Sequence, residues 1–389
     1  MTAAEQGAWL VLLSVPGLGA RRLWEVWACG DVVGEWERLR RGVAPRSFGS
    51  TPEQRSTWQE VARSLDPVGL VASHEAAGVS LTVHGDGAHP ASVERDPHLP
   101  PALLWQGAGG PSLASRRPLV GIIGTRRATR YGLELATEFG AALTAAGGCV
   151  VSGLAAGVDA AAHRGALAEL GSAASSTPTG APLAVVGSGH DVPYPRSNRR
   201  LWAEVAASGA IVSEYPLGTP PAAWRFPARN RILAALCDAV VVVESHERGG
   251  SLITAGLAGA RGVPVLAVPG GLRSAASVGC NRLIADGCQP CLGVDDVLTA
   301  VGLSSVRDVA AMLPFDSAPS PAPPLDERDG AVLDALGWER RSLDDLVEAC
   351  PSLTFGAVAL VLARLQQHGV VVEADGWFER CATFGGRSV

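Results

Sequence analysis

Between about residues 118 and 300, short apolar runs alternate with segments that have a helical pattern of apolar positions. Short apolar runs occur at 119–123, 149–152, 183–186, 210–213, 239–243 and 264–268, and helical patterns at 128–146, 159–170, 198–207, 229–236, 251–260 and 281–285. A run such as 239–243 is apolar at every position, which a parallel sheet covered on both faces requires. The alternation therefore predicts an α/β fold with a doubly wound parallel sheet, in which ligands bind at the carboxyl ends of the strands.

The first 80 residues predict a separate helical domain, 1–80. Helical patterns at 3–13 and 20–28 flank the sequence Val15-Pro16-Gly17-Leu18-Gly19. This spacing suits a helix-hairpin-helix, whose second helix can hold a DNA phosphate at its start, as well as an ordinary turn between two helices. Residues 43–63 give no clear pattern, and the strand-like pieces 81–83 and 102–105 lead into a core that we place at 81–310.

Beyond the core, the sequence predicts a linker and a small domain. The stretch from Pro314 to Pro324 is proline-rich, so we place a linker at 311–325. Helical patterns at 327–336, 342–349 and 354–368 precede an apolar run at 370–373, a turn at Asp375-Gly376, and Trp377-Phe378. Three helices and a hairpin predict a winged-helix domain at 326–380. Within the core, a stretch at 171–182 rich in Gly, Ser, Thr, Pro and Ala reads as a loop insertion.

Composition places the chain among globular proteins. Its 389 residues are 47% hydrophobic and 18% charged, which suits two or three domains. We recognise neither an uninterrupted apolar run of membrane-spanning length nor a signal peptide, so we expect a cytoplasmic protein without membrane contact.

The eight cysteines are scattered, and we interpret them as buried thiols. Cys288 and Cys291 have metal-like spacing but lack a second pair of ligands, so we expect no metal.

The formal net charge of -6 is unevenly distributed. Residues 116–300 carry 16 arginines and 13 acidic residues, whereas 1–115 carry 9 and 12, and 326–389 carry 6 and 11. The α/β core is therefore the basic part of the chain, and the winged-helix segment is acidic. All 32 basic residues are arginines, whose planar guanidinium matches phosphate and stacks on bases.

An anion site is predicted after the first strand of the core. The run at 119–123 ends in Gly124-Thr125-Arg126-Arg127, just before a helical pattern. Such a strand-to-helix turn presents backbone N–H groups and the positive end of the helix dipole, to which these arginines add charge. A plain structural turn with solvated arginines is the alternative. A dinucleotide fingerprint would need GxGxxG, which is missing, so nicotinamide chemistry is disfavoured and no cofactor is expected.

Similar polar sequences follow three other strands. Ser152 and Gly153 end the second strand, Glu214 ends the fourth and is followed by Arg229-Asn230-Arg231, and a glycine loop after the fifth leads into Gly250, Ser251, Leu252 and Thr254. Parallel strands end at one edge of the sheet, so these helix starts and Arg126 predict a groove that follows a polyanion.

Acid–base catalysis is a weaker interpretation of the same region. Asp159 and His163 lie four residues apart on one helical pattern, and Glu214 and Glu244 end strands. No nucleophile elbow, metal-ligand set or Walker sequence accompanies them. We therefore assign no catalytic residue and interpret Asp159, His163 and Glu214 as groups that support the site.

Six motifs occur in order along the core, with a gap only at the 171–182 insertion. They are GTRR after a strand, SGLAxGVDxxAH, GxGxDxxYPxxN over Gly187 to Asn198, SEYPxGxxP, FPARNRIxAAL, and GGSLITAxxA followed by VPG. Together they resemble the DNA-processing protein A family, known as DprA or Smf, over essentially all of 81–300. The flanking helical and winged-helix segments are similar to those of longer members. Gly249-Gly250-Ser251 stands where the family usually has Ser-Gly-Ser, and an arginine at 127, 130 or 248 replaces a frequent lysine.

The resemblance implies an extended Rossmann-like core that binds single-stranded DNA, forms a homodimer, and loads RecA recombinase on incoming DNA during natural transformation. It implies that Arg126 binds a phosphate and that Arg229, Asn230, Arg231, Gly250 and Ser251 form a nucleotide pocket.

The rival function is a phosphoribohydrolase of the lysine-decarboxylase-like Rossmann group, whose members carry a motif that resembles PGGxGTxxE. Here Pro269-Gly270-Gly271 is followed by Leu272-Arg273-Ser274 with no glutamate nearby, which disfavours that enzyme. A transcription factor using the winged helix is weakened by that domain's acidity, because 354–368 supplies only Arg364, and protein–protein contact suits this domain better.

Overall fold

The computed structural model describes residues 1–44, 48–94, 96, 98–172, 180–303, 326–337, 340–367, 370–374 and 376–380. The chain divides into two compact units, Met1–Asp308 and Val309–Val389. The predicted proline-rich linker at 311–325 and most of the predicted insertion at 171–182 lie outside the described residues. No helix in the ranges just given is long and apolar enough to cross a membrane.

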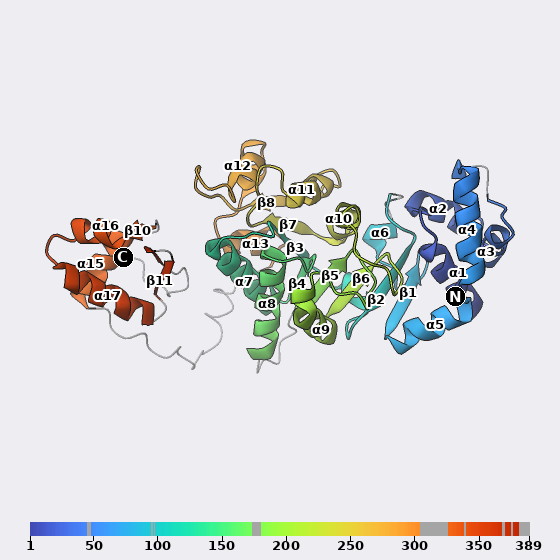
Figure 1. The fold of residues 1–389 in the computed structure, drawn as a ribbon, viewed down its shortest axis with the longest axis horizontal. Helices are drawn as coiled ribbons and strands as arrows, with labels where there is room; N and C mark the ends of the chain where they lie inside the picture. Colours follow the sequence, from blue (N-terminus) through green and yellow to red (C-terminus); the bar gives the residue numbers. More distant parts are fainter. Residues whose placement is uncertain are drawn as a thin grey trace. The chain divides into compact units, whose positions relative to one another are not determined.

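The first unit is built on a nine-stranded sheet (Figure 1). Its strands are β1 (Val79–Val83), β2 (Ala102–Gln106), β3 (Leu119–Ile123), β4 (Cys149–Ser152), β5 (Pro182–Val186), β6 (Ala210–Ser213), β7 (Ala239–Val242), β8 (Val265–Ala267) and β9 (Gln289–Pro290), in the order β1-β2-β6-β5-β4-β3-β7-β8-β9. In this order, the seven neighbouring strands β6-β5-β4-β3-β7-β8-β9 pair in parallel. β1 pairs with β2, and β2 with β6, in antiparallel register. The predicted doubly wound α/β fold is confirmed, and the strand-like pieces before it extend the same sheet as an antiparallel edge.

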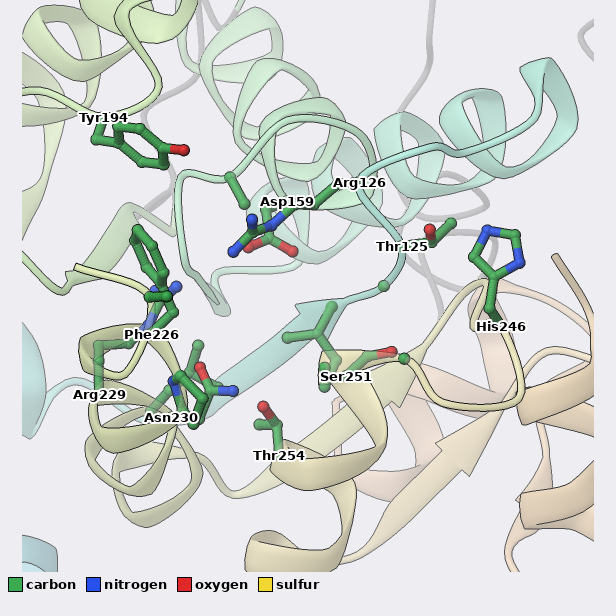
Figure 2. A pocket seen from close by; sticks show the side chains of 18 of the residues that line it. Thr125, Arg126, Asp159, Tyr194, Phe226, Arg229, Asn230, His246, Ser251 and Thr254 are labelled. Atoms are coloured by element: carbon green, nitrogen blue, oxygen red, sulfur yellow. The ribbon is translucent and has the colours of Figure 1, made fainter. Parts of the chain in front are cut away.

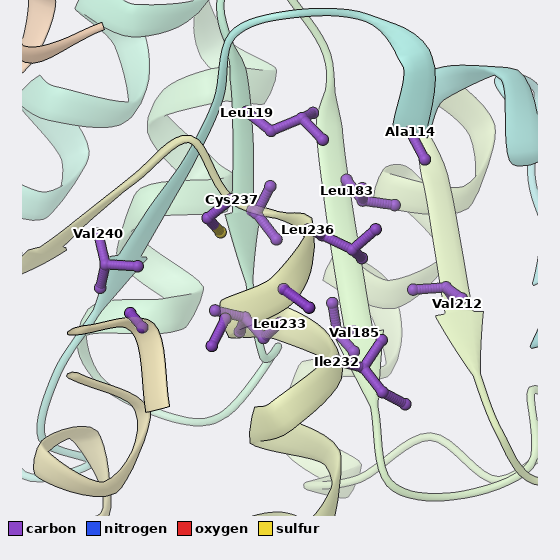
Figure 3. Close-up of a cluster of buried hydrophobic side chains, with 14 of the residues drawn as sticks. Ala114, Leu119, Leu183, Val185, Val212, Ile232, Leu233, Leu236, Cys237 and Val240 are labelled. Atoms are coloured by element: carbon purple, nitrogen blue, oxygen red, sulfur yellow. The ribbon is translucent and has the colours of Figure 1, made fainter. Parts of the chain in front are cut away.

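Helices cover both faces of the sheet, which is why its central strands are apolar throughout. The helices of the core are α6 (Ala91–Glu94), α7 (Arg130–Ala145), α8 (Val158–Ser172), α9 (Arg199–Ser208), α10 (Arg225–Leu236), α11 (Gly250–Gly259), α12 (Val278–Ala285) and α13 (Val294–Ala300), with the short 3-10 helices η2 (Pro111–Ser115) and η3 (Arg196–Asn198). One buried cluster joins α7, α8 and α13 to the sheet, and another joins α10, α11 and α12 to its other face. Figure 3 shows Ile232, Leu233 and Leu236 of α10 against strand residues such as Leu183 and Val185.

The sheet reverses its winding direction beside β3. From β3 the chain proceeds through β4, β5 and β6 on one side, then returns to place β7 on the other side of β3. In doubly wound sheets the loops that follow the two strands at such a switch diverge and leave a crevice at the carboxyl edge. The segments that follow β3 and β7 begin at Gly124 and Val243, and the second of them carries Glu244.

Three helix starts in the core differ from the sequence prediction by two residues or more, and one of them is that of α12, which begins at Val278 rather than at 281. Helix α7 begins at Arg130 rather than at 128, because Thr129 is its N-cap and accepts a hydrogen bond from the Gly132 N–H. Helix α10 begins at Arg225 rather than at 229. Pro227 lies in its first turn, where a proline costs no hydrogen bond and therefore does not end the helix. Arg229, Asn230 and Arg231 thus lie in the second turn of α10 and not at its start.

The N-terminal helices pack together and against the antiparallel edge. They are α1 (Ala3–Ser14), α2 (Ala20–Ala28), α3 (Val32–Arg40), α4 (Pro52–Ser64) and α5 (Pro67–Ala76). The first two are close to the prediction, and the hairpin residue Leu18 between them is buried in the core of this helical group. The predicted boundary at residue 80 falls inside β1, whose Val83 joins that same apolar core.

The second unit contains α15 (Glu327–Leu336), β10 (Arg341–Ser342), α16 (Leu343–Ala349), α17 (Phe355–Gln367), β11 (Val371–Ala374) and β12 (Trp377–Arg380). Its strands form a small sheet in the order β10-β12-β11, and its helices enclose their own apolar core. This arrangement confirms the predicted winged helix and adds the short strand β10. Arg364 of α17 contacts Asp326 and Asp329 of the same unit, so its charge is paired internally.

Candidate functional site

A cavity of about 810 Å³ opens at the carboxyl edge of the sheet (Figure 2). The loop after β3, the start of α8, the first turns of α10 and the start of α11 contribute to its wall. Ten of the residues singled out from the sequence line it: Gly124, Thr125, Arg126, Arg127, Asp159, Arg229, Asn230, Gly250, Ser251 and Thr254. The fold therefore brings together, in one space, motifs that are separated by up to 130 residues in the chain.

The loop after β3 is fixed by close backbone packing. A Cβ atom on Gly124 would lie 2.6 Å from the Val158 side chain and 2.8 Å from the Glu244 carbonyl oxygen, so only glycine fits between these segments. The Thr125 N–H donates to that Glu244 carbonyl at 2.8 Å. The tight turn leaves the side chains of Arg126 and Arg127 exposed at the cavity.

Several backbone donors at the start of α7 already have partners within the chain, in contrast to the sequence prediction. Thr129 donates both its N–H and its hydroxyl to the Glu244 carboxylate, and the Arg127 N–H donates to the Thr125 hydroxyl. A carboxylate of the chain thus occupies the positive end of this helix, where an external anion was expected. The positive charge that this loop presents to the cavity is therefore that of the Arg126 and Arg127 guanidinium groups.

The start of α11 is open toward the cavity. Its N-cap is Gly249, and no side chain caps the first turn. Gly250 and Ser251 line the cavity together with Thr254 one turn later, while the Leu252 N–H donates to the Gly249 carbonyl. This helix end retains the combination of dipole and uncapped amides that favours an anion.

Arg229 is a buried cation at the base of the cavity. Its guanidinium donates to the Val185 carbonyl, and a Cβ atom on Gly153 would overlap its nitrogens, so the glycine gives it room. Burial lowers the pKa of Arg229 to about 10, an effect opposed by Asp159 and strengthened by Arg126. Because this pKa is above 7, Arg229 is charged at neutral pH.

Asp159 and His163 support the site from α8. The Asp159 carboxylate accepts the Gly153 N–H at 3.1 Å. Burial raises the pKa of this carboxyl group, against the influence of Arg229 and of the backbone donors around it. His163 is fully buried, which lowers its pKa to about 3 and leaves its ring neutral at physiological pH. Ser152 is also fully buried and donates its hydroxyl to the Ile122 carbonyl at 2.7 Å.

Some predicted contacts lie outside the cavity lining. Arg231 forms an ion pair with Glu214, and the two side chains are 18% and 10% exposed. Ser152, Gly153, Leu252 and His163 also do not line the cavity. Their predicted contacts with a ligand stay predictions. In the structure they adjoin the residues that line the cavity.

One wall of the cavity is aromatic, which the sequence reasoning missed. Tyr194 and Phe226 stack with ring centroids 5.3 Å apart and an interplanar angle of 29°, and the Arg126 guanidinium lies 5.0 Å from the centre of the Phe226 ring. Figure 2 shows these two rings on one side of the cavity and Thr125, His246 and Ser251 on the other. The sequence did carry a signal for this aromatic wall, since Tyr194 and Phe226 each precede a proline inside one of the six motifs.

The arrangement suits recognition of a nucleotide rather than bond cleavage. Cationic and uncapped backbone groups can hold a phosphate, and the flat aromatic wall can contact a base. Asp159 is engaged with backbone donors, and His163 does not reach the cavity lining. Within the described parts of the chain, no three His, Cys, Asp or Glu side chains are grouped to hold a metal ion.

Comparisons with known proteins cover both units. A family model described as DNA recombination-mediator protein A matches residues 80–302, and one described as the DprA winged helix domain matches residues 316–376. The chain is 30% identical to Protein Smf from Synechocystis sp., with 97% of this chain and 98% of that protein aligned.

Two solved structures share the fold. The X-ray structure of DNA processing protein A from Streptococcus pneumoniae matches with a TM-score of 0.62 and 29% identity, covering 77% of this chain and 98% of that one. A structure that describes the single-stranded DNA binding mode of DNA processing protein A from Helicobacter pylori matches with a TM-score of 0.50 and 27% identity. It covers 59% of this chain and 96% of that one.

Proposed function

This chain belongs to the DNA recombination-mediator protein A family, and we propose that it binds single-stranded DNA at the cavity beside β3. A backbone phosphate contacts Arg126 and the start of α11, and a base lies toward Tyr194 and Phe226. The binding of single strands that is described for the Helicobacter pylori relative supports this assignment.

The observation that carries the proposal is the charge of the cavity. Its described lining holds three guanidinium groups, those of Arg126, Arg127 and Arg229, and a single carboxylate, that of Asp159. Two of these cations are close enough for the charge of Arg126 to lower the pKa of Arg229. A phosphate placed between them would relieve this repulsion, which is the physical basis of anion binding at such a pair.

The aromatic wall favours a single strand over a duplex. In duplex DNA the bases are stacked on one another and their faces are covered, whereas an unpaired base can turn its face toward an aromatic ring. The stacked pair of Tyr194 and Phe226 offers such a surface inside the cavity. Phosphate contacts read no sequence, so we expect little dependence on base sequence.

A competition gel shift tests this function. Labelled 30-nucleotide single strands of mixed sequence are bound by the purified full chain and then competed with unlabelled single strands or with the matching duplex. We expect the single strand to compete far better than the duplex. Equal or better competition by the duplex would overturn the proposal.

The family's description as a recombination mediator also supports a role with RecA. We propose that the chain, acting in the cytoplasm during natural transformation, transfers RecA recombinase onto the strand that it holds. The test is the rate of ATP hydrolysis by RecA on single strands covered with single-strand-binding protein. Addition of the chain should shorten the lag before hydrolysis, and an unchanged lag would argue against RecA loading.

We also propose that the core forms a homodimer. Leu272 and Leu292 are 91% and 79% exposed and follow the neighbouring parallel strands β8 and β9, at the same edge of the sheet. β9 is the last strand of the sheet at this side. In this dimer the second copy covers the two leucines. In sedimentation velocity the chain should run as a dimer and Leu292→Glu as a monomer, and a monomeric parent would contradict the dimer.

A further inference from the structure

Trp224 is a large aromatic side chain that remains 63% exposed beside the cavity. It is the N-cap residue of α10, in the segment whose residues Ala223 and Phe226 line the cavity. Trp224 itself is not part of that lining. The backbone of Trp224 therefore adjoins the cavity lining, and its exposed ring is open to solvent.

The Trp224 ring is held in place by its neighbours. The Arg225 guanidinium lies 5.0 Å from the centre of the Trp224 ring and 4.8 Å from the centre of the Tyr215 ring. Tyr215 and Trp224 themselves meet edge to face at 6.4 Å. Arg225 is anchored in turn by a hydrogen bond to the Pro220 carbonyl. An exposed ring that is fixed in this way loses little conformational freedom when a ligand stacks on it.

We propose that Trp224 is a stacking platform for the base of a nucleotide next to the one held in the cavity. This inference rests on the proposed function, because it places a second contact on the same strand. Base–aromatic stacking is tolerant of sequence, since every base has a flat face. Arg225 beside the ring adds positive charge close to the backbone of that nucleotide.

The proposal separates two kinds of contact on one strand. Arg126 acts on phosphate and is indifferent to the presence of a base, whereas Trp224 acts on a base and does not need the phosphate. An oligomer without bases therefore distinguishes them. It retains every phosphate of the strand but offers nothing that can stack on an indole ring.

The test measures binding of the full chain to two fluorescein-labelled 20-mers by anisotropy at one fixed salt concentration. One is a thymidine 20-mer, and the other has a tetrahydrofuran abasic unit at every position. The variants are Trp224→Ala, Trp224→Phe and Arg126→Ala. Trp377→Ala is the matched control, because Trp377 is 47% exposed on the winged helix.

Trp224→Ala should weaken binding of the thymidine 20-mer about five- to 150-fold, the range that stacking of one base corresponds to. It should leave binding of the abasic 20-mer within about twofold of the parent, and Trp224→Phe should recover part of the loss. Trp377→Ala should leave binding of both 20-mers unchanged. Unchanged binding of the thymidine 20-mer by Trp224→Ala, or an equal loss with both 20-mers, would overturn the platform and leave Trp224 as a surface for another partner.

Failure of the proposed function gives a different result. In that case the parent binds neither 20-mer, or Arg126→Ala leaves binding of both unchanged, and the stacking platform is overturned with it. If Arg126→Ala weakens binding of both 20-mers and Trp224→Ala weakens neither, the function stands and only the platform is wrong.

Discussion

The carboxylate of Glu244 accepts two hydrogen bonds from Thr129, one from the backbone N–H at 2.8 Å and one from the hydroxyl at 2.5 Å. Glu244 follows β7 and Thr129 caps α7, so this contact ties the two loops that diverge at the switch of the sheet. Gly132 in the first turn of α7 lies against the same carboxylate, leaving no room for a side chain. The Glu244 carboxylate therefore holds the end of the loop that presents Arg126.

Removing this carboxylate should destabilise the core. Glu244→Ala leaves the two half-buried donors of Thr129 without this acceptor, and we expect the free energy of unfolding to fall by about 1–3 kcal/mol. Urea denaturation measures the change. Glu247→Ala is the matched control, since Glu247 is exposed in the same loop and should shift stability by less than about 0.5 kcal/mol. Equal effects of the two variants would contradict the role given to Glu244.

The Arg229 position should depend on the absence of a side chain at residue 153. In Gly153→Ala the new Cβ would overlap the guanidinium nitrogens, so we expect a lower melting temperature and at least about tenfold weaker binding of a single strand. Gly256→Ala in α11 is the control, because nothing lies within 4 Å of its Cβ position. A normal melting temperature and normal binding in Gly153→Ala would show that Arg229 is not held as described.

Stability should decline below pH 6.5, in part through His163. Burial lowers the pKa of this ring to about 3 in the folded chain, against an ordinary value of 6.5, so the unfolded chain takes up a proton that the folded chain excludes. The contribution of neutral His163 to the free energy of unfolding is therefore fully present above pH 6.5 and is lost as the pH falls toward 3. Between pH 7 and pH 5 the loss amounts to about 2 kcal/mol.

His163→Leu removes the titrating ring and should flatten this pH dependence by that amount. Urea denaturation of both proteins at pH 7 and pH 5 gives the comparison. Any loss of packing in the variant lowers stability at both pH values alike, so the difference between them isolates the ring. An unchanged pH dependence would mean that His163 takes up its proton in the folded chain.

The sequence predicted the strands of the core well, because a strand buried on both faces must be apolar throughout, as 119–123 is. The residues at which helices begin were harder to predict. The predicted start of α10 at 229 lies after Pro227, whereas the helix begins before it, because a proline is tolerated in a first turn. Helix α4 was missed even though Thr51 and Gln54 form a capping box around Pro52, a signal that could have been recognised.

The site was predicted as a set of residues but not as a geometry. Glycine and arginine motifs at strand ends place Arg126, Arg229 and Gly250 at one edge, since parallel strands end together. The sequence could not show that Arg231 is paired with Glu214, or that the start of α7 is occupied by Glu244. Both depend on side-chain contacts between segments far apart in the chain, for which hydrophobic periodicity carries no signal.

Deleting the winged helix should leave binding by the core nearly intact. The removed region is acidic, and Arg364, the cation of α17, is already paired with Asp326 and Asp329. A chain that ends after Ala311 should bind a single strand within about threefold of the full chain, because phosphate affinity follows the cations that are free to contact it. Loss of most binding in a truncated chain that still unfolds cooperatively would place a DNA contact in the winged helix.

The measurement that tests the central claim most directly is the salt dependence of binding for the parent and for Arg126→Ala. Anisotropy titrations of a labelled thymidine 20-mer at several salt concentrations give the affinity and its log–log slope. We expect the variant to bind about ten- to hundredfold more weakly, to lose about 0.7 from the magnitude of the slope, and to keep the parental melting temperature. Arg126→Lys should recover only part of the affinity, because it keeps the charge and loses the planar fork. Arg200→Ala, which removes a 93% exposed arginine from α9, should change neither the affinity nor the slope. Parental affinity and slope in Arg126→Ala would contradict the claim that this cavity holds the strand by its phosphates.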